Sequence, residues 1–252
     1  MKTIKLIWIV IIILTIVTSC SNKIEEYTIT GQVAKTLYPE SNTITVLIGK
    51  TTIQIPFYMD SPDYCDTLPD FPVTVIPTED ADVTVGEYTI LEKSKGIYFK
   101  AAMDLKYLNK YDLSIILPDG KEFHSSCFLP DSFSIITPED NDTFSLSSIT
   151  AIWSISDSAE SYVINVAPCD SSNNARGWSA SIGDTSAIIP DSAFMDSLNN
   201  YIEGDYSVCI SAINGSWHKS SADLFLNGGN IDGAWGVYGA VVYTKPVIIK
   251  LH

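Results

Sequence analysis

Apolar and polar residues alternate with a period of two through most of this chain beyond residue 25. Such alternation places one face of a β-strand in a core and the other in solvent. The segments 27–33, 44–48 and 111–117 show it most clearly, and turn residues recur roughly every ten positions. A short helix is predicted only over 191–199, with Asp191 as its N-cap after Pro190. The pattern therefore predicts an all-β fold built from sandwiches of short strands.

Two hairpin turns are expected within this pattern. Gly49-Lys50 separates two alternating runs and is typical of a two-residue turn. Pro118-Asp119-Gly120 follows the run 111–117 and predicts a return strand over 121–128.

The first twenty residues predict export. Lys2 and Lys5 precede twelve residues, Leu6 to Val17, that are apolar except for Thr15. This run is too short to span a membrane comfortably and is typical of a signal peptide. The segment Val17-Thr18-Ser19-Cys20 that follows resembles the lipobox of bacterial lipoproteins. The alternative is an ordinary secretory signal followed by an incidental cysteine.

The lipobox resemblance implies a diacylated Cys20 at the mature N-terminus, with residues 1–19 removed as a lipoprotein signal peptide and 20–24 forming an acylated tether. Ser21 stands where an inner-membrane retention signal would have Asp. Lys23-Ile24-Glu25-Glu26 resembles the surface-export signal of Bacteroidota lipoproteins. We therefore expect a lipid-anchored protein of the outer membrane, with the periplasmic and cell-surface sides both open.

Charge divides the chain near Pro130-Asp131. The segment between Lys121 and Lys219 contains 13 acidic residues, and Arg176 is its only cation. We expect two consecutive β-sandwich modules behind the signal peptide, over 25–130 and 131–252.

The second module resembles a fibronectin type III domain. Trp153 lies in an expected strand, 149–155, and a second strand follows at 162–166. Gly204-Asp205-Tyr206-Ser207-Val208 then matches the family's Gly-x-Tyr-x-Val pattern, in which the tyrosine forms a corner.

The first module resembles transthyretin and carboxypeptidase-regulatory domains in three short pieces, 81–83, 96–98 and 111–120. This pair of modules behind a lipobox is similar to Bacteroidota outer-membrane lipoproteins of unknown function, whose Gly-aromatic C-terminal segment resembles residues 229–240. The resemblance implies a non-catalytic accessory protein of an envelope assembly, with a TonB-dependent transporter as one partner to consider. It implies no cofactor.

Four cysteines remain after Cys20, and export makes disulfides plausible in three connectivities. Two cysteines fall in each module, which suggests Cys65–Cys127 and Cys169–Cys209. In a fibronectin type III-like sandwich the strands carrying Cys169 and Cys209 are neighbours, and both side chains are expected to face outward. The alternative is two free thiols.

Catalytic and metal motifs are missing from the sequence. It has no His-Glu-x-x-His metal motif and no Gly-x-Ser-x-Gly elbow. His124 and Cys127 lie close in one expected strand, which we interpret as surface polarity. A net charge of −15, which becomes −17 once the signal is removed, excludes a nucleic-acid partner. We expect neither an enzyme nor a metal site.

Four aromatic residues in expected loops or at strand ends are candidate ligand contacts: Trp178, Trp217, Trp235 and Tyr238. Exposed rings there could stack on sugars or anchor a protein partner. Packing beneath a long loop is the equal alternative. The leading hypothesis is therefore a binding or accessory component of the envelope, and the second is a surface adhesin or glycan-binding lipoprotein.

Overall fold

The computed structural model describes residues 22–37, 40–55, 73–145, 147–216 and 229–252. Within these ranges every regular element is a strand, except for the 3₁₀ turn η2 (Asp191–Phe194). The predicted all-β sandwich fold is confirmed. The strands are β1 (Asn22–Leu37), β2 (Glu40–Ile55), β3 (Val73–Pro77), β4 (Asp82–Val85), β5 (Tyr88–Ile90), β6 (Glu92–Ser94), β7 (Ile97–Ala101), β8 (Lys110–Ile116), β9 (Glu122–Phe128), β10 (Ile135–Thr137), β11 (Thr143–Phe144), β12 (Ile149–Trp153), β13 (Ser161–Pro168), β14 (Trp178–Ile182), β15 (Ser186–Ile189), β16 (Gly204–Gly215), β17 (Trp235–Tyr243) and β18 (Val247–Leu251).

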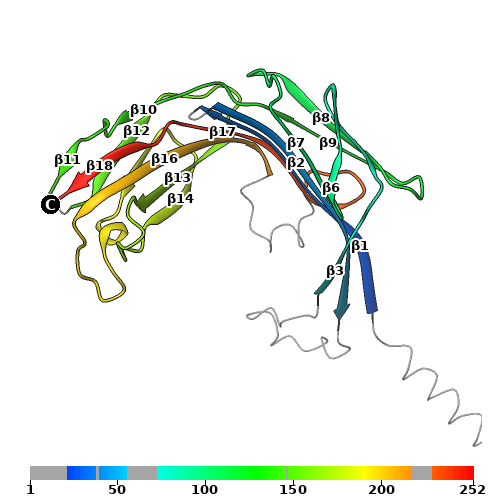
Figure 1. Ribbon diagram of the computed structural model, residues 1–252, viewed down its shortest axis with the longest axis horizontal. Coiled ribbons are helices and arrows are strands. Elements are labelled where there is room, and N and C mark those ends of the chain that lie inside the picture. Colours follow the sequence, from blue (N-terminus) through cyan, green and yellow to red (C-terminus); the bar gives the residue numbers. More distant parts are fainter. Residues whose placement is uncertain (1–21, 38–39, 56–72, 146, 217–228) are drawn as a thin grey trace, which may run out of the picture.

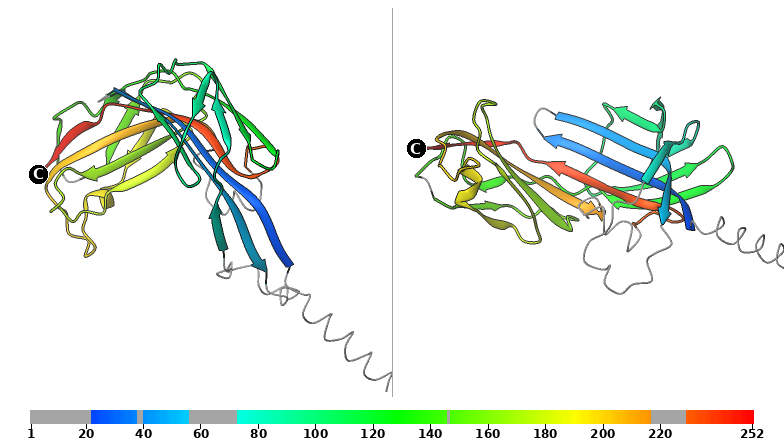
Figure 2. Two further views of the ribbon diagram at one scale, coloured as in Figure 1. Left: turned by 45° about the vertical axis from the view of Figure 1, so that its right-hand side comes forward. Right: turned by 90° about the horizontal axis from the view of Figure 1, so that it is seen from below.

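One eleven-stranded sheet runs through the molecule and is curved into an arch (Figure 1). Its main order is β11-β18-β16-β17-β1-β2-β7-β6, with β13 and β14 attached beside β16 and β3 attached beside β2. A four-stranded sheet, β5-β4-β8-β9, and a three-stranded sheet, β10-β12-β15, cover it to make two sandwiches. Figure 2 shows the same arrangement from two further directions.

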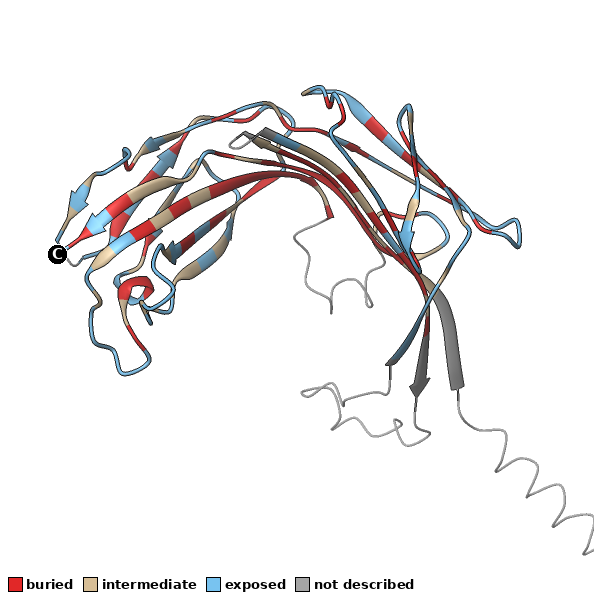
Figure 3. Cartoon of the chain, viewed as in Figure 1, coloured by how far each residue is buried: buried red, intermediate tan, exposed pale blue. Residues whose placement is uncertain are grey.

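Both smaller sheets pack against the same face of the long sheet. Strand β17 shows this directly, because its alternate residues Tyr238, Ala240 and Val242 all belong to one continuous core. That core also contains Leu113 of β8 and Trp153 of β12. Figure 3 shows buried positions alternating with exposed ones along β8, whereas β17 is buried almost throughout. We call the opposite side of the long sheet, on the inside of the arch, the inner face.

The two sandwiches are joined by a parallel ladder between β1 and β17, which runs from Thr28 opposite Trp235 to Thr36 opposite Tyr243. Strand β1 belongs to the range predicted for the first module and β17 to that of the second. The long sheet therefore continues across the predicted boundary near Pro130. Asn22 to Ile24, which the sequence assigned to a tether, lie within β1.

The predicted turn at Gly49-Lys50 is wrong, because β2 passes through it as one strand of 16 residues. Gly49 instead makes room for β3, since a Cβ atom on it would lie 2.6 Å from Val75 Cγ1. The turn at Pro118-Asp119-Gly120 is confirmed, and there the Gly120 N–H donates to Leu117 O at 2.9 Å.

The predicted helix at 191–199 is shorter than expected. It stops after Phe194 because Met195 is already extended, and Pro190 rather than Asp191 occupies the N-cap. No helix among the residues described above is long and apolar enough to cross a membrane.

Candidate binding face

Across its central seven strands, as far as their side chains are described, the inner face of the long sheet carries one charged side chain, Asp205 near the start of β16. It is built from Ser179 and Ser181 of β14, Val163 and Asn165 of β13, Ser207, Cys209, Ser211 and Ile213 of β16, Trp235, Val237, Val241 and Tyr243 of β17, Thr28, Thr30, Gln32, Ala34 and Thr36 of β1, Thr43, Thr45, Leu47 and Thr51 of β2, and Ile97 and Phe99 of β7. Asp205 lies at the far end of this face, opposite Lys250 of β18.

The outward face of the first sandwich shows the contrast. On β8, Lys110 and Asp112 both point to solvent and form an ion pair at 2.6 Å. On β9, Glu122 lies 3.5 Å from the imidazole of His124 on the same outward face. A solvated sheet face normally carries polar and charged residues in this way. The inner face lacks the charged part of that pattern.

A groove of about 410 Å³ lies on the inner face over β13, β14, β16 and β17. Ser179 Oγ donates to Asn165 Oδ1 at 2.8 Å along one wall. On the other wall, Gln32 Nε2 donates to Tyr243 Oη at 3.5 Å. Burial raises the pKa of the Tyr243 hydroxyl, so this group stays neutral at physiological pH.

The inner face also has an apolar centre. Ala34, Ile213 and Val241 are buried there as a small cluster separate from the main core, with Val163 and Tyr243 packed against them. These three side chains come from β1, β16 and β17, so the cluster lies where the two sandwiches join. Hydroxyl and amide groups surround an apolar centre, which suits recognition of an uncharged surface.

A larger cavity, of about 810 Å³, opens at the far end of the second sandwich and has an acidic rim of Asp170, Glu203 and Asp205. Asp170 is engaged locally, because its Oδ1 accepts the Ser172 N–H at 2.8 Å. Within the described ranges, no three His, Cys, Asp or Glu side chains come together to hold a metal ion.

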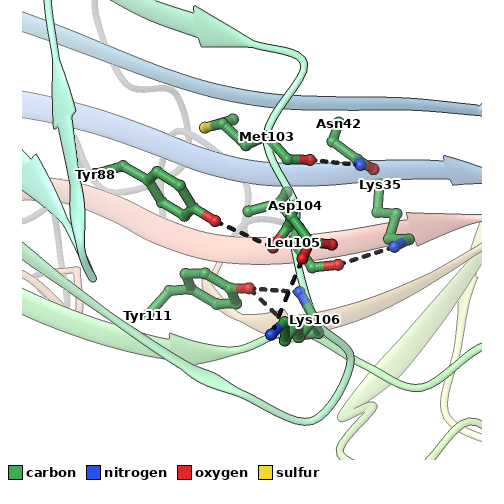
Figure 4. Close-up of polar contacts among 8 residues, drawn as sticks. All are labelled: Lys35, Asn42, Tyr88, Met103, Asp104, Leu105, Lys106 and Tyr111. Carbon is green, nitrogen blue, oxygen red and sulfur yellow. Dashed lines mark hydrogen bonds and ion pairs between the residues drawn. The ribbon is translucent and has the colours of Figure 1, made fainter.

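A strap between β7 and β8 closes the first sandwich next to the join (Figure 4). Lys35 of β1 is buried there and donates to Leu105 O at 2.8 Å. Asn42 Nδ2 donates to Met103 O at 2.8 Å, and the Tyr111 hydroxyl bonds the backbone of Lys106. These groups hold backbone in place, and we assign them a structural role.

The predicted ligand aromatics are not brought together. Trp178 is half-buried at the edge of the second core, and Trp235 is half-buried on the inner face. Tyr238 is fully buried and its hydroxyl donates to Tyr111 O at 3.1 Å, so its proposed role as a ligand contact is corrected to a core role. Trp217 lies outside the described residues.

The predicted Cys169–Cys209 bridge is absent, and both residues carry free thiols. Cys209 stands opposite Asn165 in the ladder, whereas Cys169 follows the end of β13 and its N–H donates to Asp205 O. Four residues of strand therefore separate the two thiols, too far for a disulfide.

Of the three remaining cysteines, the structure describes only Cys127. Cys20 and Cys65 lie outside the described residues. Cys127 is a free, buried thiol whose pKa burial raises to about 12. His124 is exposed on the other face of β9, so the two do not meet as a catalytic pair.

Two further expectations concern the second core. The Tyr206 hydroxyl donates to Ile202 O, four residues upstream, at 2.7 Å, which confirms the predicted tyrosine corner. Trp153 is buried and stacks edge-on against Tyr162 at 5.5 Å between ring centroids.

Sequence reasoning missed the inner face as a unit. The signal is present in β1 and β2, where threonine occupies most inner-face positions over 28–36 and 43–51 and none of these positions holds Lys, Glu or Asp. What the sequence does not show is that two distant strands, β1 and β17, bring these positions onto one surface.

No protein-family model matches the chain, and no curated protein matches its sequence. Among the solved structures similar to this chain are three distant ones. Fibronectin(III)-like modules of Clostridium thermocellum CbhA share 10% identity at a TM-score of 0.25, over 89% of this chain and 92% of theirs. The chicken CNTN1 FN1-FN3 domains share 12% at 0.26, over 91% and 65%. Bacteroides ovatus SGBP-B, solved with a mixed-linkage heptasaccharide, shares 9% at 0.18, over 91% and 60%.

Proposed function

We propose that this protein is a non-catalytic, lipid-anchored component of the bacterial outer membrane that binds a partner through the inner face of its arch. The observation that carries the proposal is the inner face itself, which is uncharged apart from Asp205 at its far end in a chain of 30 acidic and 15 basic side chains. Interface cores are depleted of charged residues in this way, because burying an unpaired charge is costly.

The anchor is the second part of the proposal. The lipobox ends at Cys20, and β1 begins at Asn22. An acyl group on Cys20 would therefore hold the arch close to the bilayer, with little chain between lipid and sheet. Two or more acyl chains give stable anchoring. The proposed partner is an outer-membrane transporter or another envelope protein held at the same membrane.

Metabolic labelling with a palmitate analogue tests the anchor. The wild-type protein should be labelled, and the Cys20→Ala variant should not. Equal labelling of both would contradict the anchor. Protease treatment of whole cells would then distinguish the surface side from the periplasmic side.

Affinity purification from solubilised membranes tests the inner face. Phe99 is 39% exposed on that face, and Phe99→Lys places a charge there without emptying the core. Ile116→Lys is the matched control, because Ile116 is 41% exposed on the outward face of β8. We expect co-purified envelope proteins to be lost with Phe99→Lys and retained with Ile116→Lys. The same partners with both variants would contradict a role for the inner face.

The alternative is a neutral glycan as the ligand. The groove is lined by hydroxyl and amide side chains, and the rings of Trp235 and Tyr243 share its face. Hydroxyl-rich walls with an aromatic ring suit an uncharged sugar. Glycan-array binding that is lost in Trp235→Ala would favour this alternative, and an array with no signal for the wild type would count against it.

A further inference from the structure

One edge of the long sheet is strand β14. Within the described ranges β14 pairs with β13 alone, so its other side presents unpaired backbone groups. Natural proteins protect such edges with charged residues, proline or a bulge. Strand β14, with the sequence Trp-Ser-Ala-Ser-Ile, contains none of these protections.

The sequence around β14 is self-complementary about Ala180. Reading outward from Ala180 in both directions, Ser179 matches Ser181, Trp178 matches Ile182, Gly177 matches Gly183, and Arg176 matches Asp184. Arg176 is the only arginine of the chain and the only cation between Lys121 and Lys219. The residue at the matching position, Asp184, is acidic.

We infer that β14 pairs with β14 of a second copy of this chain, antiparallel and centred on Ala180. In a two-fold pairing the same strand serves both partners, so residue i of one copy faces residue j of the other and the reverse. Arg176 and the second copy's Asp184 would then lie near each other just beyond both ends of the five-residue ladder. Like charges would meet nowhere in it.

The half-buried side chains of β14 also favour a pairing centred on Ala180. Trp178, Ala180 and Ile182 pack against the core on one side and are only partly covered. The pairing places Trp178 opposite Ile182 of the second copy, an aromatic–β-branched pair of the kind that stabilises antiparallel strands. Ser179 and Ser181, exposed on the inner face, would meet as a hydroxyl pair.

The part of β14 that is free to pair also has Ala180 at its centre. Before Trp178, the N–H groups of Arg176 and Gly177 already donate to Met195 O and Ala193 O. After Ile182, the chain turns through Gly183 and Asp184 to join β15 in the other sheet. The edge is therefore open over the five residues of β14, whose midpoint is Ala180.

Arg176 keeps bonding capacity for a partner. It is exposed, and one guanidinium nitrogen donates to Asn199 Oδ1 at 2.8 Å. A guanidinium carries five N–H donors, so this bond leaves others for a carboxylate. Asp184 is exposed at the opposite end of the strand.

Disulfide trapping tests the pairing on the full mature chain. Directly opposed residues of an antiparallel pair have Cβ atoms about 4.5–5.5 Å apart. In the Ala180→Cys variant the two introduced cysteines, one from each copy, would therefore lie close enough to form a disulfide. Cys169 is exposed and would complicate the result, so Cys169→Ser is the background. Thr150→Cys, exposed on β12, is the control position.

Under mild oxidation we expect a reducible dimer for Ala180→Cys and little for Thr150→Cys or the background alone. Arg176→Asp or Asp184→Arg, each added singly, should reduce the dimer to the control level by opposing like charges. The two together should restore it, which a misfolded variant would not do. Equal cross-linking at positions 180 and 150, or a double reversal that fails to restore the dimer while circular dichroism shows native sheet, would overturn the inference.

Discussion

The ring of Tyr238 fills the space that Gly31 leaves in the neighbouring strand. The two residues stand opposite each other in the parallel β1–β17 ladder. A Cβ atom on Gly31 would lie 2.8 Å from Tyr238 Cδ2, and the Tyr238 hydroxyl is fixed by its bond to Tyr111 O of β8. This contact ties together β1, β17 and the smaller sheet of the first sandwich.

Gly31→Val should therefore destabilise the protein. The tyrosine ring cannot move away without losing its hydrogen bond, and overpacking of a filled core typically costs about 1–3 kcal/mol. Urea unfolding followed by tryptophan fluorescence would measure the loss. Gly183→Ala is the matched control, because a Cβ there meets nothing within 4 Å. Equal midpoints for the two variants would contradict the tight contact.

Asn214 should be a second sensitive position at the join. Its Oδ1 accepts the Phe128 N–H at 2.7 Å, and its Nδ2 donates to Ser158 O at 2.8 Å. Asn214→Ala leaves these partly buried backbone groups without a side-chain partner, which costs up to about 1–3 kcal/mol. Chemical denaturation would show it, with the exposed Asn174→Ala as control. A change no larger than that of the control would show that water replaces the amide.

Acid should weaken the loop that follows η2. The pKa of the Asp196 carboxyl is lowered, first by the Asn200 N–H and then by the Asn200 side chain. A pKa lowered in the folded state adds stability that is present above the unfolded value, about 3.9, and is lost as the pH falls through the folded value. Asp196→Asn should lower stability at neutral pH and flatten its decline in acid. Identical pH profiles for variant and wild type would rule out this contribution.

Thiol labelling should separate the cysteines of the folded protein. Cys169 is exposed, whereas Cys127 is buried with a pKa of about 12 and is almost entirely protonated at pH 8. Since the thiolate is the reactive form, iodoacetamide should label Cys169 first and Cys127 only after denaturation. Peptide mass spectrometry would check this. Failure of Cys169 to label in the native protein would instead favour a bridged thiol.

Local patterns in the sequence were enough to predict the strands but not their partners. Alternation predicted β8 and β9 with their turn, and Gly-x-Tyr-x-Val predicted the Tyr206 corner. Glycine was read as a turn signal at Gly49, where it instead admits Val75 from a strand 26 residues later. A glycine required for close packing and one required for a turn look alike in sequence.

The candidate site was harder to predict, because it depends on contacts between distant segments. Tyr238 was read as a ring at a strand end, and nothing local shows that Gly31 leaves a place for it in the core. Cys169 and Cys209 were expected on neighbouring strands, but Cys169 lies just past the end of β13, and the register sets the two four residues apart. Register depends on the pairing of whole strands, so neither outcome can be read from local spacing alone.

The parallel ladder between β1 and β17 also has a consequence for how the chain reaches its folded state. Strand β1 emerges during synthesis well before its neighbour β17, which lies some two hundred residues later. Until β17 arrives, one side of β1 is an unpaired edge, and contacts between such distant segments form slowly. The first sandwich therefore cannot be completed before β17 has emerged. A chain exported from its N-terminus would cross the membrane with one edge of β1 still unpaired.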